Sequence, residues 1–100
     1  MPPESAGPWH LDRFEERLDW WIRDTNPPQD LVIIVLAWVV GLRRDPFRGM
    51  HRVEGFADHY FERVPNSDNG AGVAVTCSFM ADEETRTIRC DLFGTLTLPI

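Results

Sequence analysis

The feature that most constrains this chain is a run of ten apolar residues, Leu31 to Val40, within the stretch DLVIIVLAWVVGL. A helix built from this run has no face that suits water, so it needs cover from the rest of the domain or from a second subunit. The run is too short to span a bilayer, which takes about 20 apolar residues. Its flanks favour a helix over a buried strand, because Asn26 can cap the start while two arginines and Asp45-Pro46 suit the end. We therefore predict a helix from Pro27 to Arg44 that is covered on nearly all sides.

An amphipathic pattern precedes this run. Apolar side chains at positions 11, 14, 18, 21 and 22 share one stripe, which predicts a helix from Leu11 to Arg23. Trp20 lies off the stripe, so we expect it at the edge of the core or against a partner. Only Asp24–Asn26 separates the two predicted helices, and such a short connection indicates an antiparallel helical hairpin. One face of the second helix is then left for a sheet to cover.

The second half of the chain has the pattern of a sheet. Apolar alternation and turn residues predict strands at His59–Val64, Val73–Phe79 and Thr87–Phe93, with a short last strand at Thr95–Leu98. We predict an α+β fold, in which an N-terminal helical hairpin packs on a three- to four-stranded antiparallel sheet. Residues 1–100 are expected to form a single domain. Residues 1–8 are rich in Pro, Gly and Ser, so we expect them to be disordered.

Two cysteines lie in the predicted hairpin. If the turn centres between Glu83 and Glu84, Cys77 faces Cys90 and one face of the hairpin is wholly apolar. Opposed cysteines can form a cross-strand disulfide or, with further ligands, bind a soft metal. No ligand cluster adjoins them, so we expect two reduced thiols in the core, and neither a metal nor a cofactor.

Charge and composition limit the partners of this chain. Its net charge is −6, which argues against a protein that coats nucleic acid without specificity. All ten of its cationic side chains are Arg. The first ten residues have neither the basic start nor the apolar run of a signal peptide. We expect a cytoplasmic protein that does not act at a membrane.

Cationic charge concentrates in the segment Arg43 to Arg52, RRDPFRGMHR, which holds four Arg against one Asp. One interpretation is a phosphate- or carboxylate-binding site, in which His51 or His59 serves as acid or base. The alternative is that the first two arginines neutralise a helix end, while Arg48 and Arg52 pair with nearby acids. The sequence alone leaves both interpretations open.

Other candidate residues are less specific. Tyr60, the one tyrosine, is either a core aromatic with a solvated hydroxyl or a side chain that stacks on a base. The acids Asp82 to Glu84 are expected to be solvated at a hairpin turn rather than to bind a metal. The chain contains no Gly-rich phosphate loop, HExxH pair, CxxC pair or GxSxG elbow.

Three segments together resemble the RelE/ParE superfamily of bacterial toxins. LRRDPF, Leu42 to Phe47, resembles the end of a family helix and the Asp/Asn-Pro turn after it. RVEGFADHYFERV, Arg52 to Val64, resembles the stretch where a Gly leads into a strand with a Tyr and an Arg-Val pair. VTCSFMADEETRTIRCDLF, Val75 to Phe93, is similar to the final hairpin of the family. Three features differ. The usual first strand of the family is missing or reduced to Trp9–Leu11, this chain is acidic where the toxins are basic, and the seven residues after Phe93 contain no Arg, Lys, His or Tyr.

The resemblance implies a toxin that cuts messenger RNA at the ribosome or blocks DNA gyrase, and that a cognate antitoxin holds inactive. It implies phosphate contact by Arg63 and Arg52, so that with His51 these form the candidate catalytic set of a ribonuclease. The alternative hypothesis is a non-catalytic interaction module that uses an apolar surface to form a homodimer or hetero-complex. The candidate phosphate- or partner-binding residues are Arg43, Arg44, Arg48 and Tyr60.

Overall fold

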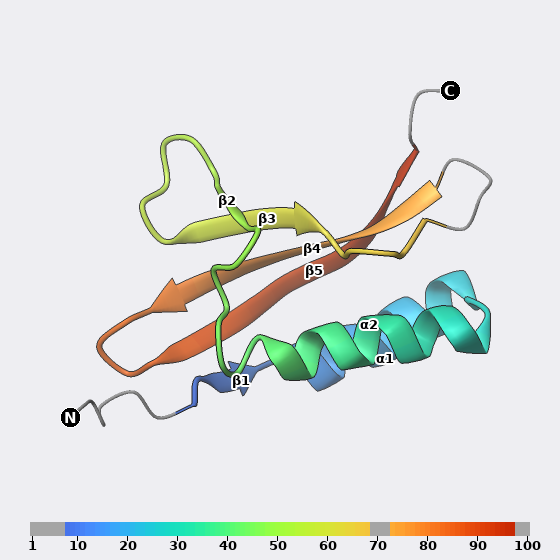
Figure 1. The fold of residues 1–100 in the computed structure, drawn as a ribbon, viewed down its shortest axis with the longest axis horizontal. Helices are drawn as coiled ribbons and strands as arrows, with labels where there is room; N and C mark the ends of the chain where they lie inside the picture. Colours follow the sequence, from blue (N-terminus) through green and yellow to red (C-terminus); the bar gives the residue numbers. More distant parts are fainter. Residues whose placement is uncertain (1–7, 69–72, 98–100) are drawn as a thin grey trace.

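The computed structural model describes residues 8–68 and 73–97 of this chain. Two helices and five strands form within these ranges. Both helices lie on one side of the sheet and run antiparallel to each other (Figure 1). Most of the segment expected to be disordered, 1–8, and the end of the last expected strand, Leu98, fall outside the described residues. The elements are β1 His10–Asp12, α1 Phe14–Thr25, α2 Gln29–Gly41, β2 His51–Arg52, β3 His59–Arg63, β4 Val73–Asp82 and β5 Thr87–Thr97.

The five strands form one sheet in the order β1-β5-β4-β3-β2. Strand β1 pairs parallel to β5, and the other neighbours are antiparallel. The α+β class is confirmed, but the expected three- to four-stranded, purely antiparallel sheet is wrong: the sheet is mixed and has five strands. Strand β1 overlaps the reduced first strand that was left open at Trp9–Leu11, and β2 was not expected; both are edge strands, of 3 and 2 residues. Segments this short are below the length at which alternation can be recognised.

Helix α1 follows the predicted stripe but has different ends. Phe14, Leu18 and Trp21 are buried, as the stripe predicted. The helix ends where Asn26 adopts a left-handed conformation, φ 46°, and donates its backbone N–H to the Ile22 carbonyl at 2.9 Å. Asn26 therefore closes α1 instead of capping α2, which begins two residues past the expected start because consecutive prolines exclude helix before them.

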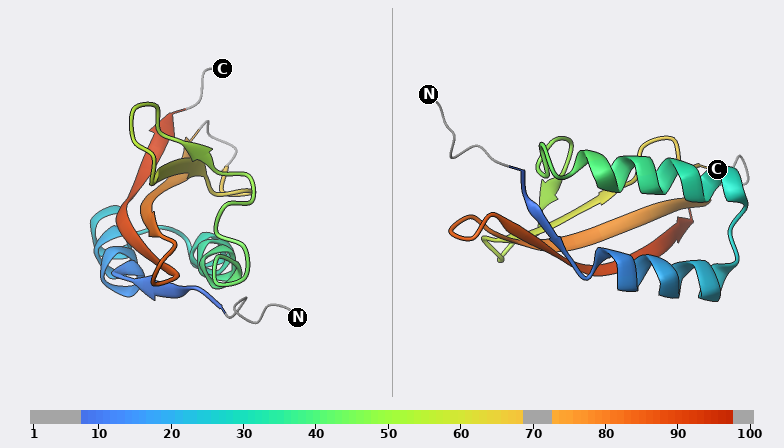
Figure 2. Two further views of the ribbon diagram at one scale, coloured as in Figure 1. Left: turned by 90° about the vertical axis from the view of Figure 1, so that its left-hand side faces the viewer. Right: turned by 90° about the horizontal axis from the view of Figure 1, so that it is seen from below.

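Helix α2 is apolar all round but is covered on only one side. Val35 and Val39 are buried, whereas Ile33, Leu36 and Val40 are exposed by 58%, 43% and 65%. The expectation of cover on nearly all sides was wrong. The helices form a single layer on a single sheet, so no described part of the chain reaches the outer side of α2 (Figure 2). Neither helix in the described residues is long and apolar enough to cross a membrane.

On the turn side of a bulge between Ser78 and Phe79, the register of the β4–β5 hairpin differs from the expected one by two residues, and Phe79 faces Cys90. Beyond the bulge it differs by three, and Cys77 faces Phe93 instead of Cys90. The physical reason is a longer connection, in which Arg86 takes a left-handed φ of 50° before β5 begins. Because the shift on the turn side is an even number of residues, the same side chains of β4 still face the helices. The apolar face of β4, and of β5 as far as Cys90, was therefore predicted correctly although the pairs were not.

The bulge adds a further change that the sequence pattern does not show. The register shifts between Ser78 and Phe79, so that Asp91 has no partner on β4. An extra residue reverses the alternation of the strand beyond it. The expected register placed Leu92 opposite Val75 on the apolar face, but Leu92 is exposed as a result of the bulge, and Phe93 is buried.

The two cysteines are free and buried in the core, diagonally across the hairpin. Burial raises the pKa of the Cys77 thiol well above its ordinary value, and a hydrogen bond with Cys90 raises it further. The folded protein therefore keeps the Cys77 proton at a pH where the unfolded chain has lost it.

This difference in pKa predicts a loss of stability in alkali. Below the unfolded pKa of about 8.5 the contribution of Cys77 is fully present, and above it stability falls by up to about 1.4 kcal/mol per pH unit until the folded thiol ionises. Urea unfolding at pH 8 and pH 10 measures this slope. The chain contains no Lys and one Tyr, so few other groups titrate in that range. The Cys77→Ala variant should have a shallower slope, and equal slopes would contradict the assignment.

Candidate functional site

The five candidate arginines lie in two places: Arg43 and Arg44 in the turn that ends α2, and the other three on the loop to β2, on β2 itself and at the end of β3. The loop after α2 leaves the helix layer and rises to β2, the edge strand that borders β3 (Figure 1). All five guanidinium groups belong to exposed residues, and none has an ion pair within the described part of the chain. The alternative in which acids neutralise Arg48 and Arg52 is therefore not what the structure shows. We call the second group the arginine edge: Arg48, Arg52 and Arg63.

A cavity of about 490 Å³ opens where β3 ends, and Gly49, Glu62 and Arg63 contribute to its lining. Glu62 makes two polar contacts beside this cavity. Its Oε2 pairs with Nδ1 of His51 at 2.5 Å, and its Oε1 accepts the backbone N–H of Arg63 at 2.7 Å. One carboxylate thus joins β2 to β3 and contacts both the His51 imidazole and the backbone of Arg63. The arrangement holds an acid–base group against the carboxylate that orients it, and the cationic residue Arg63 follows that carboxylate in the chain.

The structure brings together only part of the predicted site. Glu62 contacts the His51 side chain and the backbone of Arg63, and Arg63 lines the cavity. Arg48 precedes Gly49, a lining residue, in the chain. Arg43 and Arg44 lie apart, in the turn that ends α2. Sequence analysis missed Glu62, because its partner His51 lies on a strand too short to set a register from the pattern.

Tyr60 lies on the inner face of β3, within an aromatic stack. Its ring centroid is 4.9 Å from that of Phe47 and 5.8 Å from that of Phe79. The core interpretation fits this position. Arg52 is its register partner on β2, one strand farther out.

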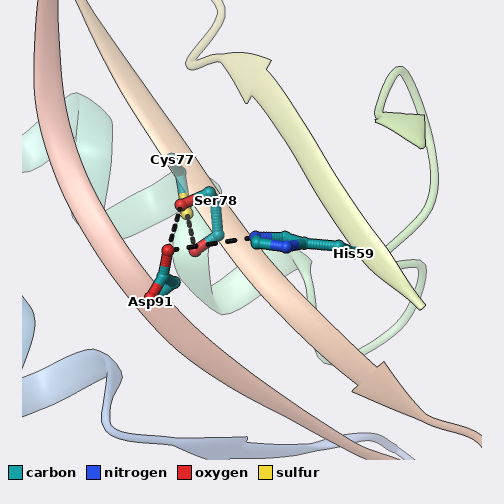
Figure 3. A network of polar contacts seen from close by, with 4 residues as sticks. All are labelled: His59, Cys77, Ser78 and Asp91. Atoms are coloured by element: carbon teal, nitrogen blue, oxygen red, sulfur yellow. Dashed lines mark hydrogen bonds and ion pairs between the residues drawn. The ribbon is translucent and has the colours of Figure 1, made fainter. Parts of the chain in front are cut away.

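A second polar group spans three strands on the face of the sheet away from the helices. Ser78 Oγ donates to Asp91 Oδ2 at 3.3 Å, and Nε2 of His59 lies 3.9 Å from the same oxygen (Figure 3). The carboxylate stands between hydroxyl and imidazole, so the imidazole is not placed to take the hydroxyl proton. These three side chains tie the bulge at Asp91 to β3 and β4, and do not form a nucleophile–base pair.

Comparison with known proteins gives one informative likeness. No protein-family model and no curated protein sequence matches this chain. The solved structure of the E. coli toxin RelE, in a form with two arginines replaced by alanine and in the free state, superposes with a TM-score of 0.60. The superposition covers 87% of this chain and 82% of the RelE chain, at 15% sequence identity. The fold is RelE-like. The likeness that the three sequence segments predicted is thereby confirmed for the fold.

Within this RelE-like fold, the arginine edge and the His51–Glu62 pair lie on β2, β3 and the loop before them. The described residues contain no group of three or more His, Cys, Asp or Glu that could hold a metal ion. The groups assembled here are those of acid–base chemistry and anion binding.

Proposed function

We propose that this chain is a toxin-like protein that acts on RNA through its arginine edge and that a cognate antitoxin holds inactive. The observation that carries the proposal is the set of exposed arginines without ion pairs beside the His51–Glu62 pair. Guanidinium groups bind phosphate in a fixed, bidentate geometry, so arginines that no carboxylate occupies are available for a nucleic-acid backbone. The RelE-like fold supports a toxin-like role.

The chemistry available at the His51–Glu62 pair suits RNA. The 2′-hydroxyl of RNA can attack the adjacent phosphorus when a base removes its proton. The 2′-oxygen–phosphorus bond then forms, the bond from phosphorus to the 5′-oxygen breaks, and that oxygen takes a proton from water or an acid. In this scheme His51 accepts the proton of the 2′-hydroxyl and the Glu62 carboxylate stabilises the imidazolium that forms. Arg63 binds the charged phosphate.

The net charge of −6 bears on the kind of target. An acidic chain with a few local cations holds free RNA weakly, because non-specific affinity grows with the number of neutralised phosphates. We therefore favour RNA presented in a defined place, such as messenger RNA on the ribosome. DNA gyrase is the alternative target, and arrest of growth with intact messenger RNA would favour it.

Growth after tightly controlled induction in a bacterial host tests the proposal. We expect arrest with the wild type and relief with Arg52→Ala/Arg63→Ala at equal soluble expression. Arg52→Ala and Arg63→Ala are also tested singly and compared with Arg23→Ala. This control removes the same charge from the exposed end of α1 and should still arrest growth. Unimpeded growth with abundant soluble wild-type protein would overturn the toxin-like role and favour the interaction module.

Binding to a single-stranded RNA oligonucleotide tests the phosphate contacts separately. The slope of log affinity against log salt concentration should fall by about 0.7 for each phosphate-binding arginine that is removed. We expect this change for Arg52→Ala and for Arg63→Ala, measured by fluorescence anisotropy between 50 and 200 mM salt. Arg23→Ala should leave the slope unchanged. An unchanged slope in all three variants would place the phosphate contacts elsewhere.

A further inference from the structure

The outer side of α2 carries an apolar surface that the fold leaves uncovered. Its side chains recur at the spacing of one helix face and lie opposite the buried Val35 and Val39. The view from below shows α2 with no other element over it (Figure 2). Three of these residues are large and exposed by more than two fifths. We call this set the α2 stripe: Ile33, Leu36, Ala37 and Val40.

The stripe is symmetric about its own centre, between Leu36 and Ala37. If a second α2 lies antiparallel across it with the two-fold axis at that point, Ile33 of one copy meets Val40 of the other. Leu36 of each copy then meets Ala37 of the other, and the small alanine leaves room for the leucine. Every apolar residue of the stripe therefore has an apolar counterpart.

The charges at the two ends of the helix obey the same symmetry. Asp30 is exposed in the first turn of α2, and Arg43 and Arg44 are exposed just beyond its last turn. The turn continues the helical path, since the Arg43 N–H donates to the Val40 carbonyl at 3.2 Å and the Arg44 N–H to the Gly41 carbonyl at 3.1 Å. About the axis that pairs Ile33 with Val40, Asp30 falls opposite Arg43 of the other copy. Two acid–arginine pairs, one at each end, would flank the apolar centre.

We propose that the α2 stripe is a homodimer surface, on which α2 of a second copy of this chain packs antiparallel. The self-complementarity of both shape and charge selects this occupant, because an unrelated partner would have no reason to match a two-fold axis within one helix. The surface lies on the helix layer, whereas β2 and β3 with their candidate residues lie in the sheet. The proposal stands without the proposed toxin-like function, and the two are tested by different measurements.

Sedimentation of the purified full-length chain at increasing concentration tests the dimer. We expect a monomer–dimer equilibrium in the wild type and a monomer at every concentration for Ile33→Glu/Val40→Glu. The matched control Leu92→Glu/Leu96→Glu places the same charges on exposed apolar residues of β5 and should still dimerise. Circular dichroism establishes that each variant is folded. A monomeric wild type, or a dimer that survives the α2 change, would overturn the proposal.

Charge reversal tests the antiparallel register itself. Asp30→Arg should weaken dimerisation about tenfold, because it sets like charges together at both ends of the interface. Adding Arg43→Asp in the same chain should restore most of the affinity, as expected for directly paired sites. Loss without rescue would overturn the register. If the wild type bound a helix of another protein on the stripe in place of a second copy, the choice of occupant would also be overturned.

Discussion

Replacing Trp21 with alanine is expected to lower the free energy of unfolding by about 3–5 kcal/mol, the usual loss for a large aromatic side chain in a core. Trp21 is 2% exposed on the inner side of α1, and its ring lies 6.4 Å from that of Phe93 on β5. Its indole Nε1 has no hydrogen-bond partner among the described residues. The loss should therefore come from packing alone, measured by urea unfolding.

The neighbouring Trp20 provides a matched control. It is the same residue type in the same helix, but it is 55% exposed. We expect Trp20→Ala to cost less than about 1 kcal/mol, as surface substitutions do, because the indole already contacts water. Similar losses at both positions would mean that α1 does not present the Trp21 side to the sheet.

Replacing Phe79 with alanine is expected to cost a similar amount, about 3–5 kcal/mol. Phe79 is fully buried on the inner face of β4. Its ring contacts Phe14 of α1 at 6.3 Å and Tyr60 of β3 at 5.8 Å between centroids, so the truncation removes packing between the sheet and the helix layer. Thermal and urea unfolding of the variant would both show the loss.

Phe61 gives the corresponding control on the other face of the sheet. It lies on β3, next to Tyr60, but points away from the helices and is 43% exposed. Phe61→Ala should cost less than about 1 kcal/mol by the same measurements. A large loss at Phe61 with a small one at Phe79 would mean that the faces of the sheet are reversed.

Part of the candidate site follows from local composition and part does not. The density of arginine from Arg43 to Arg52 is visible in the sequence, and these side chains are indeed exposed. Whether they pair with acids depends on which carboxylates lie within reach, and that is set by the path of the loop. The contact between His51 and Glu62 depends on a strand of 2 residues that carries no periodic signal.

The same distinction holds for the fold. Periodicity gives the inner side of α1, from Phe14 to Trp21, and the inner face of β4, because each is a local repeat that burial on one face requires. A pattern that is apolar on every side, as in α2, has no preferred face, so only the packing of one helix layer on one sheet leaves Ile33 and Val40 in water. The edge strands and the bulge at Asp91 likewise depend on pairing between distant segments of the chain. A local sequence pattern carries no information on the free energy of that pairing. The sequence alone thus determined the two helices, the longer strands and the inner sides of α1 and β4, whereas tertiary contacts determined the edge strands, the bulge and which side of α2 is exposed.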